Sequence, residues 1–105
     1  MTKVIYEPEK YRLCIHGHAG AAPMGKDVVC ASASILGWTL LGAAMDPEEY
    51  HASYHLDEKT GLMDIRCEPE EQASIACRYL YEIIAYGFWM MADKYPDYVT
   101  FERSE

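Results

Sequence analysis

An uncharged stretch from Val28 to Met45 constrains the fold of this chain more than any other feature of its sequence. About eighteen residues is the lower limit for a helix that spans a membrane. Glycines and hydroxyl side chains interrupt its apolar character, however, and Asp27 and Asp46 stand directly at its two ends. A helix that is apolar all round can equally be buried in a protein core. We therefore expect a central buried helix here and no membrane span.

Composition restricts both the size of the protein and its partners. With 105 residues, 50% of them hydrophobic, the chain can bury the core of one domain, which we expect to cover residues 1–105. Its net charge of −8 argues against direct nucleic-acid binding, because neutralising phosphates needs clustered Lys and Arg. The same charge would attract a basic polypeptide.

The four cysteines raise the question of metal binding or disulfides. No two of them form a Cys-x-x-Cys pair, which excludes the usual zinc finger or zinc ribbon. No charged and apolar segment that resembles a secretion signal precedes them. We therefore expect free thiols in a reducing cytoplasm.

Hydrophobic periodicity and turn residues divide the chain into five strands and two helices. The expected strands are residues 3–6, 11–17, 51–56, 62–67 and 98–103, and the expected helices are residues 27–44 and 69–93. The resulting order, ββαββαβ, predicts an α+β fold in which two helices pack against a largely antiparallel sheet.

The second predicted helix is apolar on more than one face. Its inner stripe is expected to consist of Ala73, Ala76, Cys77, Leu80, Ile84 and Met91. Five further apolar side chains in its C-terminal half cannot all share that stripe, so some of them must meet another surface. They are Ile83, Tyr86, Phe88, Trp89 and Met90. That surface is either the first helix or a second copy of the chain, and we expect a homodimer.

Cys30 has the features of a catalytic cysteine. Asp27 is a favourable N-cap residue, and a helix that begins there places Cys30 in its first turn. Unpaired N–H groups and the helix dipole at that position favour the thiolate, which is the nucleophilic form of cysteine. The residues that follow are small, which leaves room for a peptide. An inert buried cysteine fits the same position.

His18 stands twelve residues before Cys30, where the second strand is expected to end. If the intervening residues fold back, its imidazole meets the start of the helix. An imidazole titrates near neutral pH, so it can take the thiol proton and later protonate the leaving amine. One His and one Cys at this spacing are compatible with a thiol protease without establishing one.

The residues around this pair resemble the signature of the bacterial ribosomal-processing cysteine proteases. The matching residues are Gly17-His18-Ala19, Gly25-x-Asp27-Val28-Val29-Cys30-Ala31 and Ser34. The resemblance implies that His18 and Cys30 are the catalytic pair and that Asp27 and Ser34 support them. It also implies a homodimer that removes a short N-terminal extension from a large-subunit ribosomal protein. The implied substrate is apolar before the cut and basic beyond it, and we expect no cofactor.

In that family a flexible loop between the catalytic residues orders around the substrate, and residues 19–26 correspond to it. The residues that this resemblance assigns to the substrate loop are Gly17, Ala19, Gly20, Pro23, Gly25 and Lys26. The oxyanion that forms on attack needs two hydrogen-bond donors. With a helix that starts at Asp27, we expect these donors to be the Cys30 N–H and an amide near Gly25 or Lys26.

Two other functions fit the same residues. By strand alternation Cys14, His16 and His18 share one face of the sheet, so with Cys30 they could form a four-ligand metal site. Alternatively, a catalytically silent module for ribosome assembly would keep the fold and the dimer without a reactive Cys30.

Overall fold

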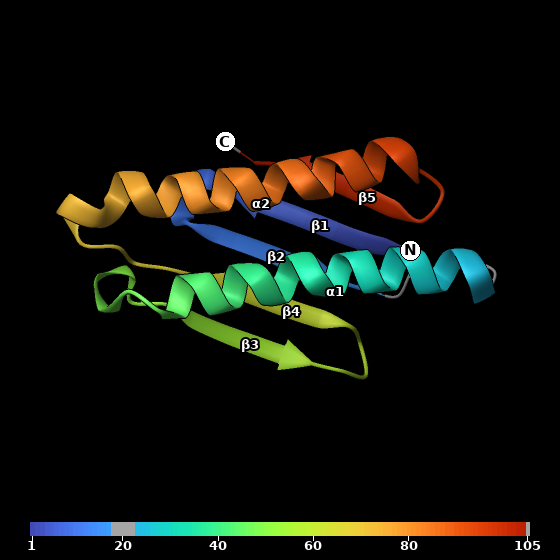
Figure 1. The fold of residues 1–105 in the computed structure, drawn as a ribbon, viewed down its shortest axis with the longest axis horizontal. Coiled ribbons are helices and arrows are strands. Elements are labelled where there is room, and N and C mark those ends of the chain that lie inside the picture. The colour runs from blue at the N-terminus through green and yellow to red at the C-terminus, as the bar shows by residue number, and fades with distance from the viewer. Residues whose placement is uncertain (18–22, 105) are drawn as a thin grey trace.

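The computed structural model describes residues 1–17 and 23–104, which form a five-stranded sheet with two helices on one of its faces (Figure 1). The strands are β1 (Thr2–Glu7), β2 (Arg12–His16), β3 (Ser53–Asp57), β4 (Leu62–Arg66) and β5 (Val99–Arg103). The helices are α1 (Pro23–Met45) and α2 (Ser74–Lys94). This confirms the predicted α+β fold and the order ββαββαβ.

The sheet is mixed, with the strand order β3-β4-β2-β1-β5. The pairs β1–β2, β2–β4 and β3–β4 are antiparallel, as predicted for most of the sheet. The last strand, β5, follows α2 and pairs parallel to β1. Figure 1 shows α1 and α2 side by side and antiparallel on the same face of the sheet. They touch closely at Gly87, where an added Cβ would lie 2.9 Å from a methyl group of Leu36.

The hydrophobic core lies between the sheet and the helices, on the faces that strand alternation predicted. Val4, Leu13 and Ile65 on the inner face of the sheet are at most 1% exposed. Leu40 of α1 and Phe88 of α2 are completely buried against them. Phe88 was expected outside the inner stripe of the second helix, and Ala76, expected inside it, is exposed. The core therefore binds both helices to one side of the sheet.

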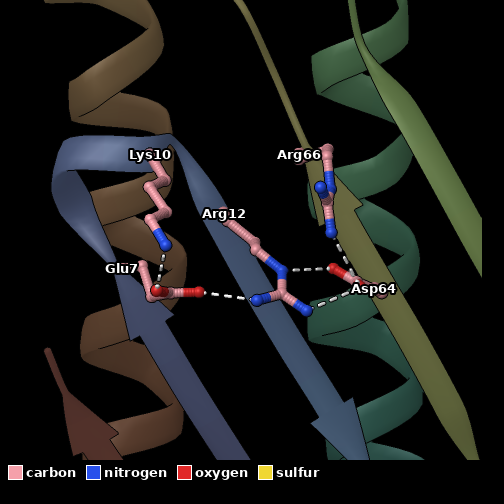
Figure 2. Close-up of polar contacts among 5 residues, drawn as sticks. All are labelled: Glu7, Lys10, Arg12, Asp64 and Arg66. Atoms are coloured by element: carbon pink, nitrogen blue, oxygen red, sulfur yellow. Dashed lines mark hydrogen bonds and ion pairs between the residues drawn. The ribbon is translucent and has the colours of Figure 1, made fainter.

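The opposite, open face of the sheet carries an ion network instead of a second apolar layer (Figure 2). Arg12 on β2 donates from Nε and Nη2 to the two carboxylate oxygens of Asp64 on β4, at 2.9 and 2.8 Å. Its Nη1 donates to Glu7 on β1 at 2.7 Å. Lys10 and Arg66 extend the network to either side. These contacts join three neighbouring strands across a solvent-facing surface.

The first helix begins four residues earlier than predicted, at Pro23 instead of Asp27. Proline is favoured in the first turn of a helix because its missing N–H would be unpaired there anyway. The expectation that Asp27 is an N-cap was therefore wrong, because its backbone is already helical. Cys30 is the eighth residue of α1, and not a first-turn residue.

The second helix begins later than predicted, at Ser74 instead of Pro69, after a short 3₁₀ turn over Glu71–Ala73. The preceding backbone is held extended by tertiary hydrogen bonds. Its Glu68 N–H donates to the Tyr50 carbonyl at 3.0 Å, and its Glu70 N–H to the Glu49 carbonyl at 2.9 Å. These bonds override the local helix-start signal at Pro69.

The stretch Val28–Met45 of α1 is long and apolar enough, by length and composition, to cross a membrane. In the structure one side of this helix packs on the sheet, with Val29 and Leu40 completely buried. Core helices of soluble proteins have the same length and composition. The absence of a membrane span stays a prediction that the core packing favours.

Candidate active site

A cavity of about 370 Å³ opens beside the N-terminal half of α1. Cys30, Ser34 and Trp38 line it from the helix, at successive turns of one helical face. Cys30 is half-buried and Ser34 is exposed. The structure thus brings together Cys30 and Ser34, two of the residues that the sequence singled out, in one open cavity.

The remaining walls of the cavity are mostly apolar and come from the sheet. Ile15 of β2 and the cross-strand pair Leu56 and Met63 form its floor, and Leu62 adds to one wall. None of these residues, nor Trp38, was predicted from the sequence to be part of the site. The signals that could have found them are the i, i+4, i+8 spacing from Cys30 to Trp38 and the inward positions of Leu56 and Met63 on their strands.

Gly17 forms part of the cavity wall at the end of β2. Its φ of +88° and the space around it both require glycine, because an added Cβ would lie 2.5 Å from the Met1 carbonyl oxygen. Its N–H donates to the carbonyl of Thr60, in the turn between β3 and β4, at 2.9 Å. This bend ends the strand alternation before His18, which lies with Ala19 and Gly20 outside the described residues.

The mouth of the cavity carries two acidic residues, Asp57 and Glu58, from the end of β3 and the turn that follows. The Asp57 carboxylate accepts a hydrogen bond from the Lys59 N–H at 3.0 Å, which fixes the turn. With a net charge of −8 on the chain, the field at this mouth favours a cationic ligand.

Two expectations about the start of α1 are wrong: that residues 23–26 form a loop, and that the Cys30 N–H is free to bind the oxyanion. Pro23, Gly25 and Lys26 belong to helix α1 and not to a loop. Only the first four N–H groups of a helix lack an intrahelical partner, so the Cys30 N–H at the eighth position is not a free oxyanion donor. The side chain of Asp27 lies outside the described part of the chain, so its supporting role stays a prediction.

The alternative four-ligand metal site is not formed by the ligands that the structure describes. Cys14 and His16 project from the open face of the sheet, because Leu13 and Ile15, which alternate with them along β2, point into the core. Cys30 lies on the helix side of the same sheet. Among residues 1–17 and 23–104 no group of three or more His, Cys, Asp or Glu side chains could hold a metal ion.

The other three cysteines lie in surroundings unlike those of Cys30. Burial, together with the Asp64 carboxylate, raises the pKa of the Cys14 thiol. Cys67 and Cys77 are buried core residues, and burial beside Cys67 raises the pKa of Cys77 to about 12. Cys67 accepts a hydrogen bond from the Tyr81 hydroxyl at 3.4 Å. Of the four thiols, Cys30 is the one that lines the cavity.

A cavity with a half-buried thiol, apolar walls and an acidic mouth has the parts of a peptide-cleaving site. Comparison with known protein families tests this interpretation. The family described as cysteine protease Prp matches residues 1–100 of the chain. The chain belongs to the Prp family of cysteine proteases. The family match confirms the resemblance predicted from the sequence and shows that the chain is a cysteine protease. It favours the protease over the catalytically silent assembly module.

Solved structures share the Prp fold at low sequence identity. The ribosomal processing protease Prp from S. aureus with a covalently linked product peptide is 18% identical, with a TM-score of 0.82 over 99% of this chain and 100% of that one. The same protease with a substrate peptide is 16% identical, with a TM-score of 0.76 over 98% and 97%. SMU.848 from Streptococcus mutans is 21% identical, with a TM-score of 0.74 over 97% and 94%. No curated protein sequence matches the chain.

Proposed function

We propose that this Prp-family protease removes a short N-terminal extension from a basic large-subunit ribosomal protein in the bacterial cytoplasm, with Cys30 as nucleophile and His18 as general base and acid. The observation that carries the proposal is the Cys30 thiol in a cavity whose wall includes Gly17. His18 is the residue that follows Gly17 in the chain. The S. aureus relatives are described as ribosomal processing proteases, one with a substrate peptide and one with a product peptide.

The reaction follows from the chemistry of a thiol and an imidazole. The His18 imidazole takes the proton of the Cys30 thiol, and the thiolate attacks the scissile carbonyl carbon. The tetrahedral oxyanion collapses to a thioester as the imidazolium protonates the leaving amine. Water, deprotonated by the same imidazole, then attacks the thioester and releases the new carboxyl end, which restores the thiol.

The cavity suits a peptide that is apolar before the cut and basic beyond it. Trp38, Leu56 and Met63 offer an apolar surface next to Cys30, large enough for a bulky side chain. Asp57 and Glu58 at the mouth attract the basic part of the substrate. The chain's overall charge of −8 steers the same basic protein toward the site.

We propose a homodimer that forms through the outer surface of the two helices. This helix face consists of Val28, Ile35, Trp38 and Met45 on α1 and Ile75, Tyr79, Ile83, Tyr86 and Met90 on α2, each 48–71% exposed. Those exposed fractions amount to an apolar surface on the order of 1,000 Å², comparable to the area that one partner buries in a standard interface. The alternative is that the apolar side chains of the two helices only pack against each other. Contact between α1 and α2 buries only the sides on which they meet, and it leaves the helix face uncovered.

The test of the catalytic assignment is cleavage of a synthetic peptide that spans the extension and the first residues of the mature ribosomal protein. Cys30→Ala and His18→Ala should each abolish cleavage. Wild-type protein should release two fragments whose masses sum to the mass of the peptide plus one water. Cys14→Ala is the matched control, because its thiol lies on the open face of the sheet. Cleavage that survives Cys30→Ala would refute the proposed nucleophile.

A second measurement compares the thiols directly. Iodoacetamide should alkylate Cys30 at least about tenfold faster than Cys14, Cys67 or Cys77, because thiolate fraction and exposure set the rate. Peptide mapping by mass spectrometry gives the rate at each site. Equal labelling of Cys30 and Cys14 would contradict an activated thiol in the cavity.

A further inference from the structure

Trp38 belongs to two surfaces at once. It lines the cavity one helical turn beyond Ser34 and two turns beyond Cys30. It is also 54% exposed and lies on the helix face with Ile35 and Met45, which are three and seven residues away. Because each residue advances about 100° around a helix, the stripe that faces the cavity and the stripe that faces outward meet at this side chain.

We propose that a second copy of the chain, seated on the helix face, forms the outer wall of the catalytic cavity by covering Trp38, so that peptide cleavage requires the dimer. The inference rests on the proposed function, because it concerns the same cavity. In a single chain the outer side of the Trp38 indole is in contact with water. In the dimer the indole is held between the partner and the cavity, which gives the apolar wall a fixed position next to Cys30.

The scarcity of charge over the centre of the helix face argues for a second copy as its occupant. The chain has a net charge of −8, so two copies repel each other wherever acidic surfaces meet. Between residues 28 and 45 of α1 there is no charged side chain. Arg78 and Glu82 of α2 are directed to the β5 side, where Glu82 accepts from Arg103 at 2.9 Å. Two copies can therefore meet through the centre of this face, away from the exposed Asp93 at the end of α2, without placing like charges opposite each other.

The covering of Trp38 by a second copy has a physical consequence for catalysis. A cavity wall that is fixed before the peptide binds does not have to be ordered during the reaction, and a misplacement of about 1 Å can cost roughly a hundredfold in rate. Covering Trp38 also removes water from one side of the site, which strengthens the polar interactions made there. The dimer therefore acts on the rate of cleavage as well as on solubility.

The experiment uses full-length Ile83→Glu and Thr100→Glu. Ile83 is 69% exposed on the helix face and is not among the described cavity residues, whereas Thr100 is exposed on the open face of the sheet. Both variants introduce the same charge. We expect Ile83→Glu to be monomeric by sedimentation velocity and to lose roughly tenfold to a hundredfold in kcat/KM on the fluorogenic extension peptide. Thr100→Glu should remain dimeric and active.

Three results would overturn the inference: a monomeric wild-type protein, an Ile83→Glu variant that stays dimeric, or a monomeric variant with unchanged kcat/KM. If Ile83→Glu fails to fold by circular dichroism, dilution of the wild-type protein decides instead. Activity per chain must then fall as the dimer dissociates, and a constant value contradicts the proposal.

A fluorescence readout separates this inference from the proposed function. In Trp89→Phe protein Trp38 is the remaining tryptophan. Its emission should shift to longer wavelength when the dimer is diluted, because the indole becomes exposed. If the wild-type protein cleaves no extension peptide but this shift occurs, the proposed substrate is wrong and the covered Trp38 stands. Cleavage with no shift refutes the covered Trp38 alone.

Discussion

The two faces of the sheet use neighbouring residues of the same strands for opposite purposes. On β4, Ile65 points into the core and is completely buried, while Asp64 beside it lies on the open face and binds Arg12. On β2, the buried Leu13 and the partly exposed Cys14 show the same contrast. The face that a residue occupies therefore decides its environment here, and a shift of one position along a strand moves a side chain to the other face.

Cover on the helix side is incomplete at one place, and the cavity lies there. Two helices lie over the inner strands, but the edge strand β3 is less well covered, because Tyr54 on its inner face is 50% exposed. The space between α1 and the β3–β4 hairpin is therefore open, and Cys30 lines it. The open face has a cysteine as well, but partial burial of Cys14 and, after it, the nearby Asp64 carboxylate raise the pKa of its thiol.

The largest expected effect comes from the buried side of this comparison. Ile65→Ala should lower the free energy of unfolding by about 2–5 kcal/mol, because it removes buried methyl groups and leaves a cavity in the core beneath the helix layer. Urea titration followed by circular dichroism measures the change. A loss below about 1 kcal/mol would mean that the helix layer repacks, and the contrast between the two faces would be weaker than the burial suggests.

The open face should respond less, and its response should depend on pH. Asp64→Asn should lower the free energy of unfolding at pH 7 by about 1–2 kcal/mol, because Arg12 loses a charged, bidentate partner in a partly buried site. The hydrogen bonds from Arg12 hold the pKa of Asp64 below its ordinary value of 3.8. A lowered pKa stabilises the fold above that ordinary value, and the stabilisation is lost as the pH falls through the lower, folded value. Wild type and variant should therefore converge in acid.

Glu70→Gln is the matched control for Asp64→Asn. The pKa of Glu70 is also lowered, by hydrogen bonds from Gln72 and His51, but its side chain is half exposed and water screens the pair. We expect no measurable change in stability from this variant. Urea titrations of both variants from pH 7 to pH 3 make the comparison. A difference between wild type and Asp64→Asn that stays constant over this range would contradict the ionic origin of the effect.

Local periodicity was sufficient to predict the element order and the strand faces, because each follows from side chains a few residues apart. The strand order was not predictable in this way. The parallel pairing of β5 with β1 joins segments almost a whole chain apart, and nothing in the five residues of β5 indicates which strand it pairs with. The start of α2 was misplaced for a similar reason, because remote hydrogen bonds from the Glu49 and Tyr50 carbonyls hold the chain before it extended.

The candidate site was predicted in its chemistry and not in its shape. Cys30 and Ser34 could be named from the sequence because they lie on one helix and match a family signature. The start of α1 at Pro23 was missed because Gly25 and the small residues around it are typical of loops. Leu56 and Met63 were missed because local periodicity predicts which side chains face inward. It does not predict where inward-facing side chains are left without a packing partner and line a cavity.

The smallest expected effect concerns the floor of the cavity. A Cβ added at Gly37 would lie 2.7 Å from the sulfur of Met63 and 3.1 Å from a methyl group of Ile15, two residues that line the cavity. Because the Met63 side chain is flexible, we expect Gly37→Ala to push it toward the cavity. The variant should raise KM severalfold and lower the free energy of unfolding by about 1 kcal/mol, as overpacking outweighs the gain in helix propensity.

Gly42→Ala is the counterpart on the same helix, because an added Cβ there meets nothing within 4 Å in the chain. It should raise the free energy of unfolding of the single chain by about 0.5–1 kcal/mol, since there only helix propensity is altered. Urea titration at low protein concentration keeps the helix face free of a second copy, and peptide kinetics supply KM. If both variants behave alike, close packing of α1 on Met63 does not set the shape of the cavity, and the incomplete cover over β3 alone must explain why it forms beside Cys30.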